Sequence, residues 1–123
     1  MFVKVQDAAD TLVVQNQDRT ADLIVRLEGI RAPQVGEPWW AVCSTRLGNH
    51  LRGRDLVVRV NGAAPGADGA VPGKVFADRG RVDVAARLVR SGCARTAPGA
   101  DRWLAIQEGA ARQERRGIWA DPR

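Results

Sequence analysis

Cysteine and histidine are scarce in this sequence, which holds two cysteines and one histidine among its 123 residues. Two cysteines are too few for a disulfide framework, and Cys43 and Cys93 lack the paired spacing of a zinc site. We therefore expect no structural metal and two buried, reduced thiols, while a bridge between these distant positions stays open. His50 has no serine, cysteine or carboxylate placed to act with it, so we expect a structural or surface role.

Long apolar runs are also absent. No segment approaches the roughly 18 consecutive apolar residues of a membrane-spanning helix, and the opening MFVKVQDAAD lacks a basic region followed by an apolar one. We expect a soluble, cytoplasmic chain with no membrane partner. The hydrophobic content of 45% is too high for a disordered protein. The length suits one hydrophobic core, which predicts a single domain over residues 1–123.

Positive charge is in moderate excess. Nineteen Lys and Arg residues stand against 14 Asp and Glu residues, which gives a net charge of +5 and a pI near 10.5. This balance permits a polyanionic partner such as nucleic acid, but a modest positive charge also serves solubility.

The first thirty residues predict a β-meander. Residues 2–6, 11–15 and 22–27 carry β-branched side chains with partial alternation of polar and apolar positions, as strands do. Polar residues at 7–10 and 16–19 predict the two connecting turns.

Helical periodicity begins after this meander. Apolar residues recur at helical spacing between Trp40 and Leu51, which predicts a helix over 38–51 that ends at Gly53. Asp83 is expected to cap a later helix, and Gly92 to stop it. The other predicted elements are a strand at 55–61, a loop at 61–73, a strand at 74–77 and helices at 83–89 and 101–116. This order predicts a mainly β, α+β fold, a small five-stranded barrel with about three helices.

Several segments together resemble a known family. They are Asp10-Thr11, VRLEGIRAPQ at 25–34, GRDLVV at 53–58, LVRSGCA at 88–94, and AAR with RGIW at 110–119. In order and spacing they are similar to the staphylococcal nuclease-like (thermonuclease) family, over almost the whole chain. The resemblance implies an OB-fold barrel with added helices.

The resemblance also implies an activity, because active members of that family hydrolyse phosphodiesters with one Ca²⁺. It implies two metal-binding carboxylates, a glutamate that positions or deprotonates water, and two arginines on the phosphate. Carboxylate oxygens suit the hard Ca²⁺ ion, which polarises the phosphoryl oxygen. Guanidinium groups match the charge that grows on phosphate.

Only two of these roles fall on matching residues. Asp10 matches one metal-binding aspartate, and Arg26 matches one phosphate-binding arginine. Arg31 stands at the second metal aspartate, Gln34 at the glutamate, and Ala70 at the second arginine. Ala8 stands at a further aspartate position of the family, and Asp7 is the candidate substitute for that aspartate. Lys74, Arg79 and Arg81 are the candidate replacements for the positive charge of the second arginine.

These losses predict a catalytically degenerate fold. Removing a general base costs roughly 10² to 10⁴ in rate, and removing one charge-stabilising donor costs about 10² to 10³. With a cation also at the metal position, activity by the family mechanism should fall at least about a million-fold. We therefore assign no catalytic residue, expect no enzyme activity by this mechanism, and expect no cofactor.

Simple structural roles compete with these assignments. Arg26 either points into the remnant cleft or pairs with Asp10 or Glu28. Asp10 either belongs only to a turn or forms an ion pair with Arg31 that replaces the metal.

The tryptophans and the C-terminal arginines carry further alternatives. Trp40 lies on the apolar stripe and is expected in the core. Trp39 lies one residue off it and either packs at the helix edge or is exposed to stack a base or a partner. The remaining basic residues form either a nucleic-acid face or a solvated helix surface; they are Arg112, Arg115, Arg116 and Arg123.

Three functions follow from these observations. The leading one is a binding or accessory module for nucleic acid, single strands above all, through Arg26, Arg31, Lys74 and Trp39. The second is a divergent, Ca²⁺-dependent phosphodiesterase with a site rebuilt from carboxylates. Its carboxylates would be Asp7, Asp10 and Glu28. The third is a protein-interaction subunit that docks through Trp39.

Overall fold

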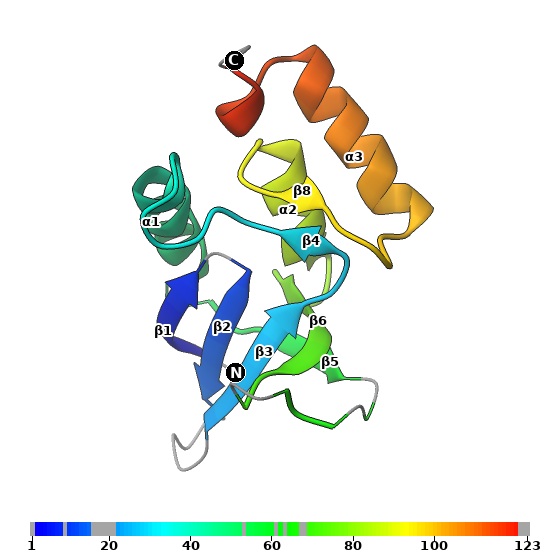
Figure 1. The fold of residues 1–123 in the computed structure, drawn as a ribbon. Coiled ribbons are helices and arrows are strands. Elements are labelled where there is room, and N and C mark those ends of the chain that lie inside the picture. Colours follow the sequence, from blue (N-terminus) through cyan, green and yellow to red (C-terminus); the bar gives the residue numbers. More distant parts are fainter. Residues whose placement is uncertain are drawn as a thin grey trace.

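A sheet of six strands forms one layer of the protein, and three helices form the other (Figure 1). The computed structural model describes residues 2–8, 10–15, 22–52, 54–60, 62, 64–66 and 69–120. The strands are β1 (Phe2–Ala8), β2 (Thr11–Gln15), β3 (Asp22–Leu27), β6 (Val71–Ala77) and β5 (Val57–Val60), in that spatial order, with β7 (Val82–Asp83) beside β6. Among the described residues this order is an open path. The α+β class and the three helices are confirmed.

The N-terminal strands form where alternation of side chains predicts them. In β2, Leu12 and Val14 are fully buried between half-buried neighbours. In β3, Val25 and Leu27 are buried and Arg26 is exposed on the opposite face. The antiparallel register aligns Thr11 with Arg26, and the Leu27 N–H donates to the Asp10 carbonyl at 2.8 Å. This pairing places Asp10 beside the end of β3.

Strand β6 is longer than its sequence predicts. It begins at Val71, so the expectation of a loop as far as residue 73 is wrong. Gly73 lies so close to β5 that an added Cβ would stand 2.8 Å from the Arg59 carbonyl oxygen. The Glu28 N–H donates to the Gly73 carbonyl from the other side at 3.0 Å. Tertiary pairing on both edges therefore makes a strand from a segment whose Gly and Pro content favours a loop.

The helices follow their predicted apolar and capping residues. They are α1 (Trp40–Leu51), α2 (Val84–Arg90) and α3 (Arg102–Gln113), followed by a 3-10 turn, η1 (Gly117–Trp119). Asp83 caps α2 as predicted and accepts from the Ala85 N–H at 3.0 Å. Asp101 caps α3 by accepting from the Leu104 N–H at 2.9 Å.

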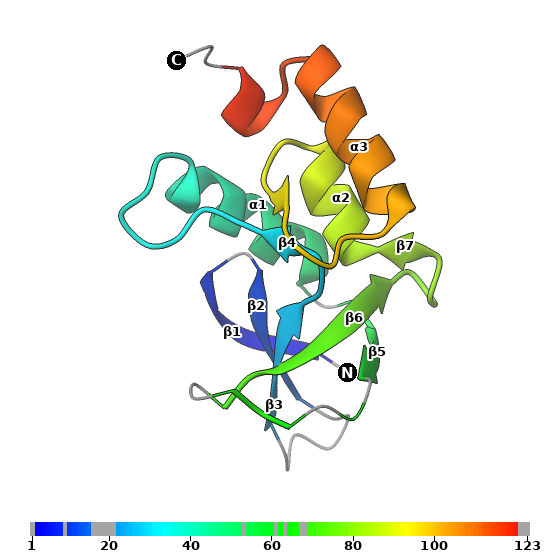
Figure 2. The ribbon, with the colours of Figure 1, turned by 45° about the vertical axis from the view of Figure 1, so that its right-hand side comes forward.

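A second, very small sheet joins the two layers. It pairs β4 (Ile30–Arg31) with β8 (Arg95–Thr96), antiparallel, and Figure 2 shows β4 between the large sheet and the helices. The register sets Arg31 opposite Arg95. Strands of two residues carry no periodicity, so the sequence does not predict them.

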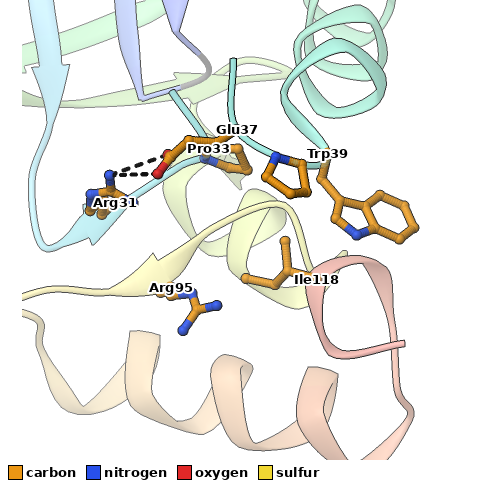
Figure 3. A pocket seen from close by; sticks show the side chains of 7 residues that line it. Arg31, Pro33, Glu37, Trp39, Arg95 and Ile118 are labelled. Atoms are coloured by element: carbon orange, nitrogen blue, oxygen red, sulfur yellow. Dashed lines mark hydrogen bonds and ion pairs between the residues drawn. The ribbon is translucent and has the colours of Figure 1, made fainter. Parts of the chain in front are cut away.

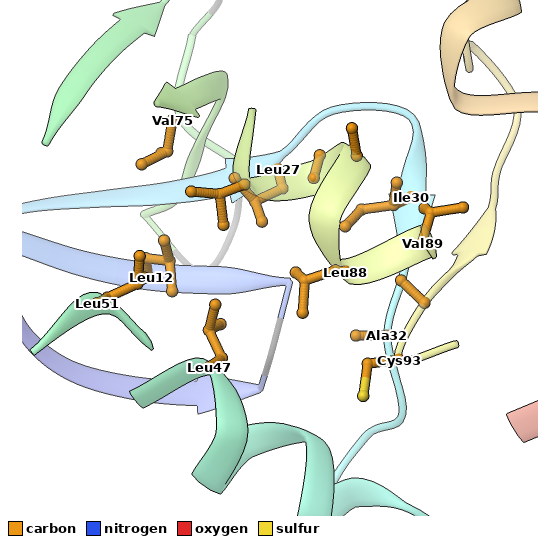
Figure 4. Packing of buried hydrophobic residues seen from close by; sticks show 14 of the residues in the cluster. Leu12, Leu27, Ile30, Ala32, Leu47, Leu51, Val75, Leu88, Val89 and Cys93 are labelled. Carbon is orange, nitrogen blue, oxygen red and sulfur yellow. The ribbon is translucent and has the colours of Figure 1, made fainter. Parts of the chain in front are cut away.

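The core lies between the sheet and the helices (Figure 4). Leu12, Leu27 and Val75 come from the sheet, while Leu47 and Leu88 come from α1 and α2. All five are no more than 5% exposed, and their side chains converge on one cluster.

Cys43 and Cys93 form a disulfide, so the prediction of two reduced thiols is wrong. Cys43 lies on the buried face of α1, and Cys93 follows Gly92 in the turn after α2. Their Cα atoms are 5.4 Å apart, within the usual range for a bridge. The two thiols meet because both elements pack on the same core.

Some predicted features lie outside the described residues. They are the turn at 16–19, Gly53, Asn61 and Arg123. Within the described part of the chain, no helix has the length and apolar content that crossing a bilayer requires.

Candidate functional site

Asp10 is buried, with 7% of its surface exposed, and its carboxylate accepts three hydrogen bonds. Oδ2 accepts from the Ala32 backbone N–H at 3.1 Å and from Gln34 Nε2 at 3.3 Å. Oδ1 accepts from the Thr11 hydroxyl at 3.3 Å. Asp10 therefore links the start of β2 to the segment after β4.

Gln34 lies where the family resemblance sets the glutamate, and it faces Asp10. Its Nε2 donates both to Asp10 Oδ2 and to the Ala32 carbonyl oxygen, at 3.3 and 2.8 Å. The structure thus brings together two of the positions that the sequence singled out. The amide is an N–H donor to its neighbours in both contacts, a role that an ionised glutamate cannot fill.

Arg31 pairs with Glu37, a different partner from the Asp10 carboxylate expected as one alternative. Its Nη2 lies 3.2 Å from both Glu37 carboxylate oxygens. Glu37 also accepts from the Gln34 backbone N–H at 2.7 Å. The Gln34 N–H and the Arg31 guanidinium hold the pKa of Glu37 below its usual range, so this carboxylate is ionised at neutral pH.

A cavity of about 240 Å³ opens beside this ion pair (Figure 3). Its lining residues are Arg31, Pro33, Glu37, Pro38, Trp39, Arg95 and Ile118. We call it the β4–β8 cavity. It brings together Arg31 and Trp39, two of the four residues predicted to contact nucleic acid.

Trp39 stands just before α1 in a left-handed backbone conformation, with φ of 71°. It is half-buried and packs against the core, so full exposure of its ring is excluded. Trp40 is half-buried too and lies outside the core cluster, so the prediction that it is a core residue is wrong. The left-handed backbone of Trp39 places it outside the regular helix, which begins at Trp40.

Arg95 is a cavity residue that the sequence did not indicate. Its guanidinium carbon lies 5.0 Å from the centre of the Trp119 ring. Arg112 lies 4.4 Å from the same ring. Because β8 has only two residues, no alternation in the sequence marks Arg95, and only the pairing with β4 brings it to Arg31.

Arg26 lies in a different hollow. This hollow, of about 380 Å³, is formed by the end of β3, the following turn, Pro72 and residues 97–99. Arg26 is exposed there and is aligned with Pro72 across the parallel β3–β6 pair. The structure therefore separates Arg26 from Arg31 and Trp39.

Lys74 lies on the same outward face of the sheet as Arg26. It is two residues beyond Pro72 on β6, and strand residues two apart share a face. Its ammonium group is 3.6 Å from the Asp101 carboxylate. Arg59 of β5 stands opposite Lys74 and is 5.1 Å from the centre of the Phe76 ring. Arg26, Lys74 and Arg59 thus form a basic strip over β3, β6 and β5.

The position of the second family arginine holds no cation. Ala70 is buried, with 2% of its surface exposed. Arg79 and Arg81 are exposed in the turn between β6 and β7, away from the Ala70 position.

The C-terminal arginines divide between ion pairs and solvent. Arg112 pairs with Glu108 at 3.2 Å, and Arg116 pairs with Glu114 at 2.7 Å. Arg115 is exposed. Two of the three described arginines of this segment are therefore partly neutralised.

His50 lies half-buried at a cavity of about 320 Å³ between α1 and α2, next to the disulfide. Burial lowers the pKa of His50, and the charges of Arg87 and Arg54 lower it further. Within the described residues, its buried Nε2 has no hydrogen-bond partner. His50 is therefore neutral at physiological pH.

The described residues hold no group of three or more His, Cys, Asp or Glu side chains arranged to bind a metal. The side chain of Asp7, which belongs to the predicted rebuilt site, lies outside the described side chains.

These features define an α+β domain in which α1 and α2 pack on the large sheet and α3 packs on α2. A family model described as staphylococcal nuclease homologue matches residues 24–121, and the chain therefore belongs to the staphylococcal nuclease homologue family. The matched segment includes Arg26, Arg31, Gln34 and Ala70, and Asp10 precedes it. A comparison with curated proteins finds no match.

Proposed function

We propose that this protein binds nucleic acid, single strands above all, and does not cut it by the mechanism of its family. The observation that carries the proposal is the pair of contacts around β4. Gln34 donates to Asp10, and Arg31 pairs with Glu37, at positions where the family resemblance requires a base and a metal ligand. At both positions, the side chain thus bonds to another part of the protein and does not serve as a base or a metal ligand.

A Ca²⁺ ion does not fit the residues present. Ca²⁺ takes roughly six to eight oxygen ligands. Asp10 Oδ2 instead faces two N–H donors, from Ala32 and Gln34, which would have to move before a cation could bind. Arg31 adds a positive charge in place of the second carboxylate. We therefore expect the protein to bind its ligand without a metal or other cofactor.

The proposed binding surface is the basic strip of Arg26, Lys74 and Arg59. These side chains lie on one face of three neighbouring strands, so they can contact successive phosphates of an extended strand. Phe76 lies on the same strand as Lys74 and two residues beyond it, and it offers a ring beside the charges. Basic groups with an aromatic ring on a curved sheet suit single strands, whose bases are free to stack.

Fluorescence anisotropy with a labelled single-stranded oligonucleotide tests this surface. For Arg26→Gln we expect weaker binding and a shallower dependence on salt, because each lost phosphate contact lowers the salt slope by about 0.7. Arg46→Gln removes one exposed charge from α1 and serves as the matched control. Equal losses of affinity in the two variants would show that binding depends on the net charge of the protein and not on the basic strip. Flat titrations of the wild type at low salt would contradict the proposal.

Digestion assays separate this function from the divergent nuclease. Labelled DNA and RNA are incubated with Ca²⁺, Mg²⁺ or Mn²⁺ and with EDTA. We expect intact nucleic acid in every case. Metal-dependent cleavage that Asp10→Ala abolishes would instead support a rebuilt active site.

A further inference from the structure

Two arginines face each other across the small β4–β8 sheet, and both line the β4–β8 cavity. Like charges in directly opposed positions of an antiparallel pair destabilise it. One carboxylate, that of Glu37, lines the same cavity, so two guanidinium groups and one carboxylate leave a charge of +1 there. This arrangement favours an additional anion.

The two arginines differ in their partners. Arg31 makes a double contact with Glu37, and these side chains are 55% and 42% exposed. The contact is an open ion pair at the rim, of the kind that contributes little stability. Arg95 contacts the Trp119 ring and attracts the Glu37 carboxylate at longer range, but no ion pair joins it to a carboxylate among the described residues. Its guanidinium therefore has donors available for an incoming anion.

The cavity has a charged end and an apolar end. Figure 3 shows Arg31 and Arg95 at one side, and the Trp39 ring with Ile118 at the other. Its volume of about 240 Å³ lies below the roughly 300 to 1,000 Å³ of most drug-sized ligand pockets. A small group fits such a space, whereas a continuing strand does not.

We propose that the β4–β8 cavity binds a terminal phosphate monoester of a nucleotide, with the phosphate between Arg31 and Arg95 and the base toward Trp39. The choice of a nucleotide rests on the proposed function. A phosphate monoester carries a charge of about −1.5 to −2 at neutral pH. It therefore matches two guanidinium groups better than an internal phosphodiester, which carries one charge. In the bound state the phosphate takes the place of Glu37 on Arg31.

Calorimetric titration with adenosine monophosphate, adenosine and inorganic phosphate tests the cavity directly. We expect the nucleotide to bind more tightly than either fragment, because only the nucleotide reaches both ends. Arg95→Gln should weaken its binding about tenfold or more, since a hydrogen bond to a charged group is lost. Arg52→Gln removes the same charge from the exposed residue that follows α1 and should leave binding within about a factor of two.

Glu37→Gln should change the affinity for the nucleotide in the opposite direction. It therefore keeps the inference testable if the Arg95 variant does not fold. The amide removes the charge that competes for Arg31, so nucleotide binding should become several-fold tighter. Thermal unfolding establishes that each variant is folded. Nucleotide binding no tighter than that of phosphate, or unchanged in both variants, would overturn the inference.

Oligonucleotides of one sequence with a 5′-phosphate, a 3′-phosphate or neither then separate this inference from the proposed function. Tighter binding of one phosphorylated strand, lost in Arg95→Gln, identifies the end that enters the cavity. Equal binding of all three strands would overturn end recognition while leaving the basic strip as the binding surface. Mononucleotide binding without any strand binding would support the cavity and contradict the proposed function.

Discussion

Gln34 links the buried carboxylate of Asp10 to the segment that carries Arg31. A glutamate at this position would place a second carboxylate beside that of Asp10, and the two would repel each other unless a cation lay between them. The amide instead bonds to Asp10 directly, at 3.3 Å. A single side chain thus stabilises the fold where the family resemblance implies a base.

Gln34→Glu tests this role. The variant removes the N–H donor and sets a second carboxylate against Asp10, so the free energy of unfolding at pH 7.5 should fall by about 1 to 3 kcal/mol. The deficit should shrink toward pH 4, because protonation of one carboxyl group restores a hydrogen bond. Urea unfolding measures both values, with Gln113→Glu at the exposed end of α3 as the control. Wild-type stability in Gln34→Glu at pH 7.5 would contradict the arrangement.

His50 predicts a pH dependence of stability near neutrality. Burial and the charges of Arg87 and Arg54 lower the pKa of His50 in the folded protein. The unfolded chain therefore takes up this proton first, and the free energy of unfolding falls as the pH drops below about 6.5. The fall ends once the pH is below the pKa of His50 in the folded state.

Urea unfolding between pH 7.5 and 5.5 measures this effect. The wild type should lose stability over this interval, and His50→Gln should lose less. The carboxylates of Glu37 and Glu114, whose pKa values are also lowered, contribute stability that is lost only below about pH 4.5. Identical pH profiles for wild type and His50→Gln would contradict a half-buried histidine whose pKa is lowered.

At the scale of elements, the disulfide ties α1 to the turn after α2. It closes a loop with a sequence separation of 50 residues. In the chain-entropy model a loop of this length stabilises the folded state by about 4 kcal/mol. The Cys43→Ala/Cys93→Ala variant should therefore lose about 2 to 4 kcal/mol of unfolding free energy.

Reductant supplies the matched comparison for this prediction. Dithiothreitol should lower the urea midpoint of the wild type toward that of the double variant, and should leave the double variant unchanged. A wild-type midpoint that does not respond after complete reduction would contradict a stabilising bridge. Disulfides are rare in cytosolic proteins. The cytoplasmic location stays a prediction, and it no longer has reduced thiols as support.

The elements that the sequence predicts well are those whose own pattern determines them. Strands β2 and β3 begin and end at the predicted residues, because each buries alternate side chains. Asp83 caps α2 because its carboxylate meets local backbone donors. The β4–β8 pair and the start of β6 depend on contacts distant in sequence, so no local pattern contains them.

The same distinction applies to the candidate site. Arg26, Arg31 and Gln34 could be found from one ungapped segment, VRLEGIRAPQ. The neighbours of Arg31 could not be found in this way. Glu37 approaches Arg31 through a turn, and Arg95 lies opposite it only because β4 pairs with β8. The sequence also predicts that Arg26 and Trp39 contact the same ligand, whereas in the fold they line separate cavities.

At the scale of the whole molecule, the net charge of +5 has a spatial arrangement. Several arginines and Lys74 have acidic partners, as at Lys74–Asp101 and Arg90–Glu114. The sheet carries a basic strip, and the β4–β8 cavity carries a second, smaller positive site. On this staphylococcal nuclease homologue fold, the two positive surfaces are therefore the ones that we propose to bind phosphate.

Binding without cleavage is tested by an anisotropy titration of a labelled single-stranded oligonucleotide in the presence of Ca²⁺, with the oligonucleotide recovered afterwards. We expect saturable binding that weakens with salt, and an oligonucleotide that is recovered at full length. A flat titration at low salt would contradict nucleic-acid binding. Shortened oligonucleotide that EDTA or Asp10→Ala protects would contradict the loss of the family mechanism.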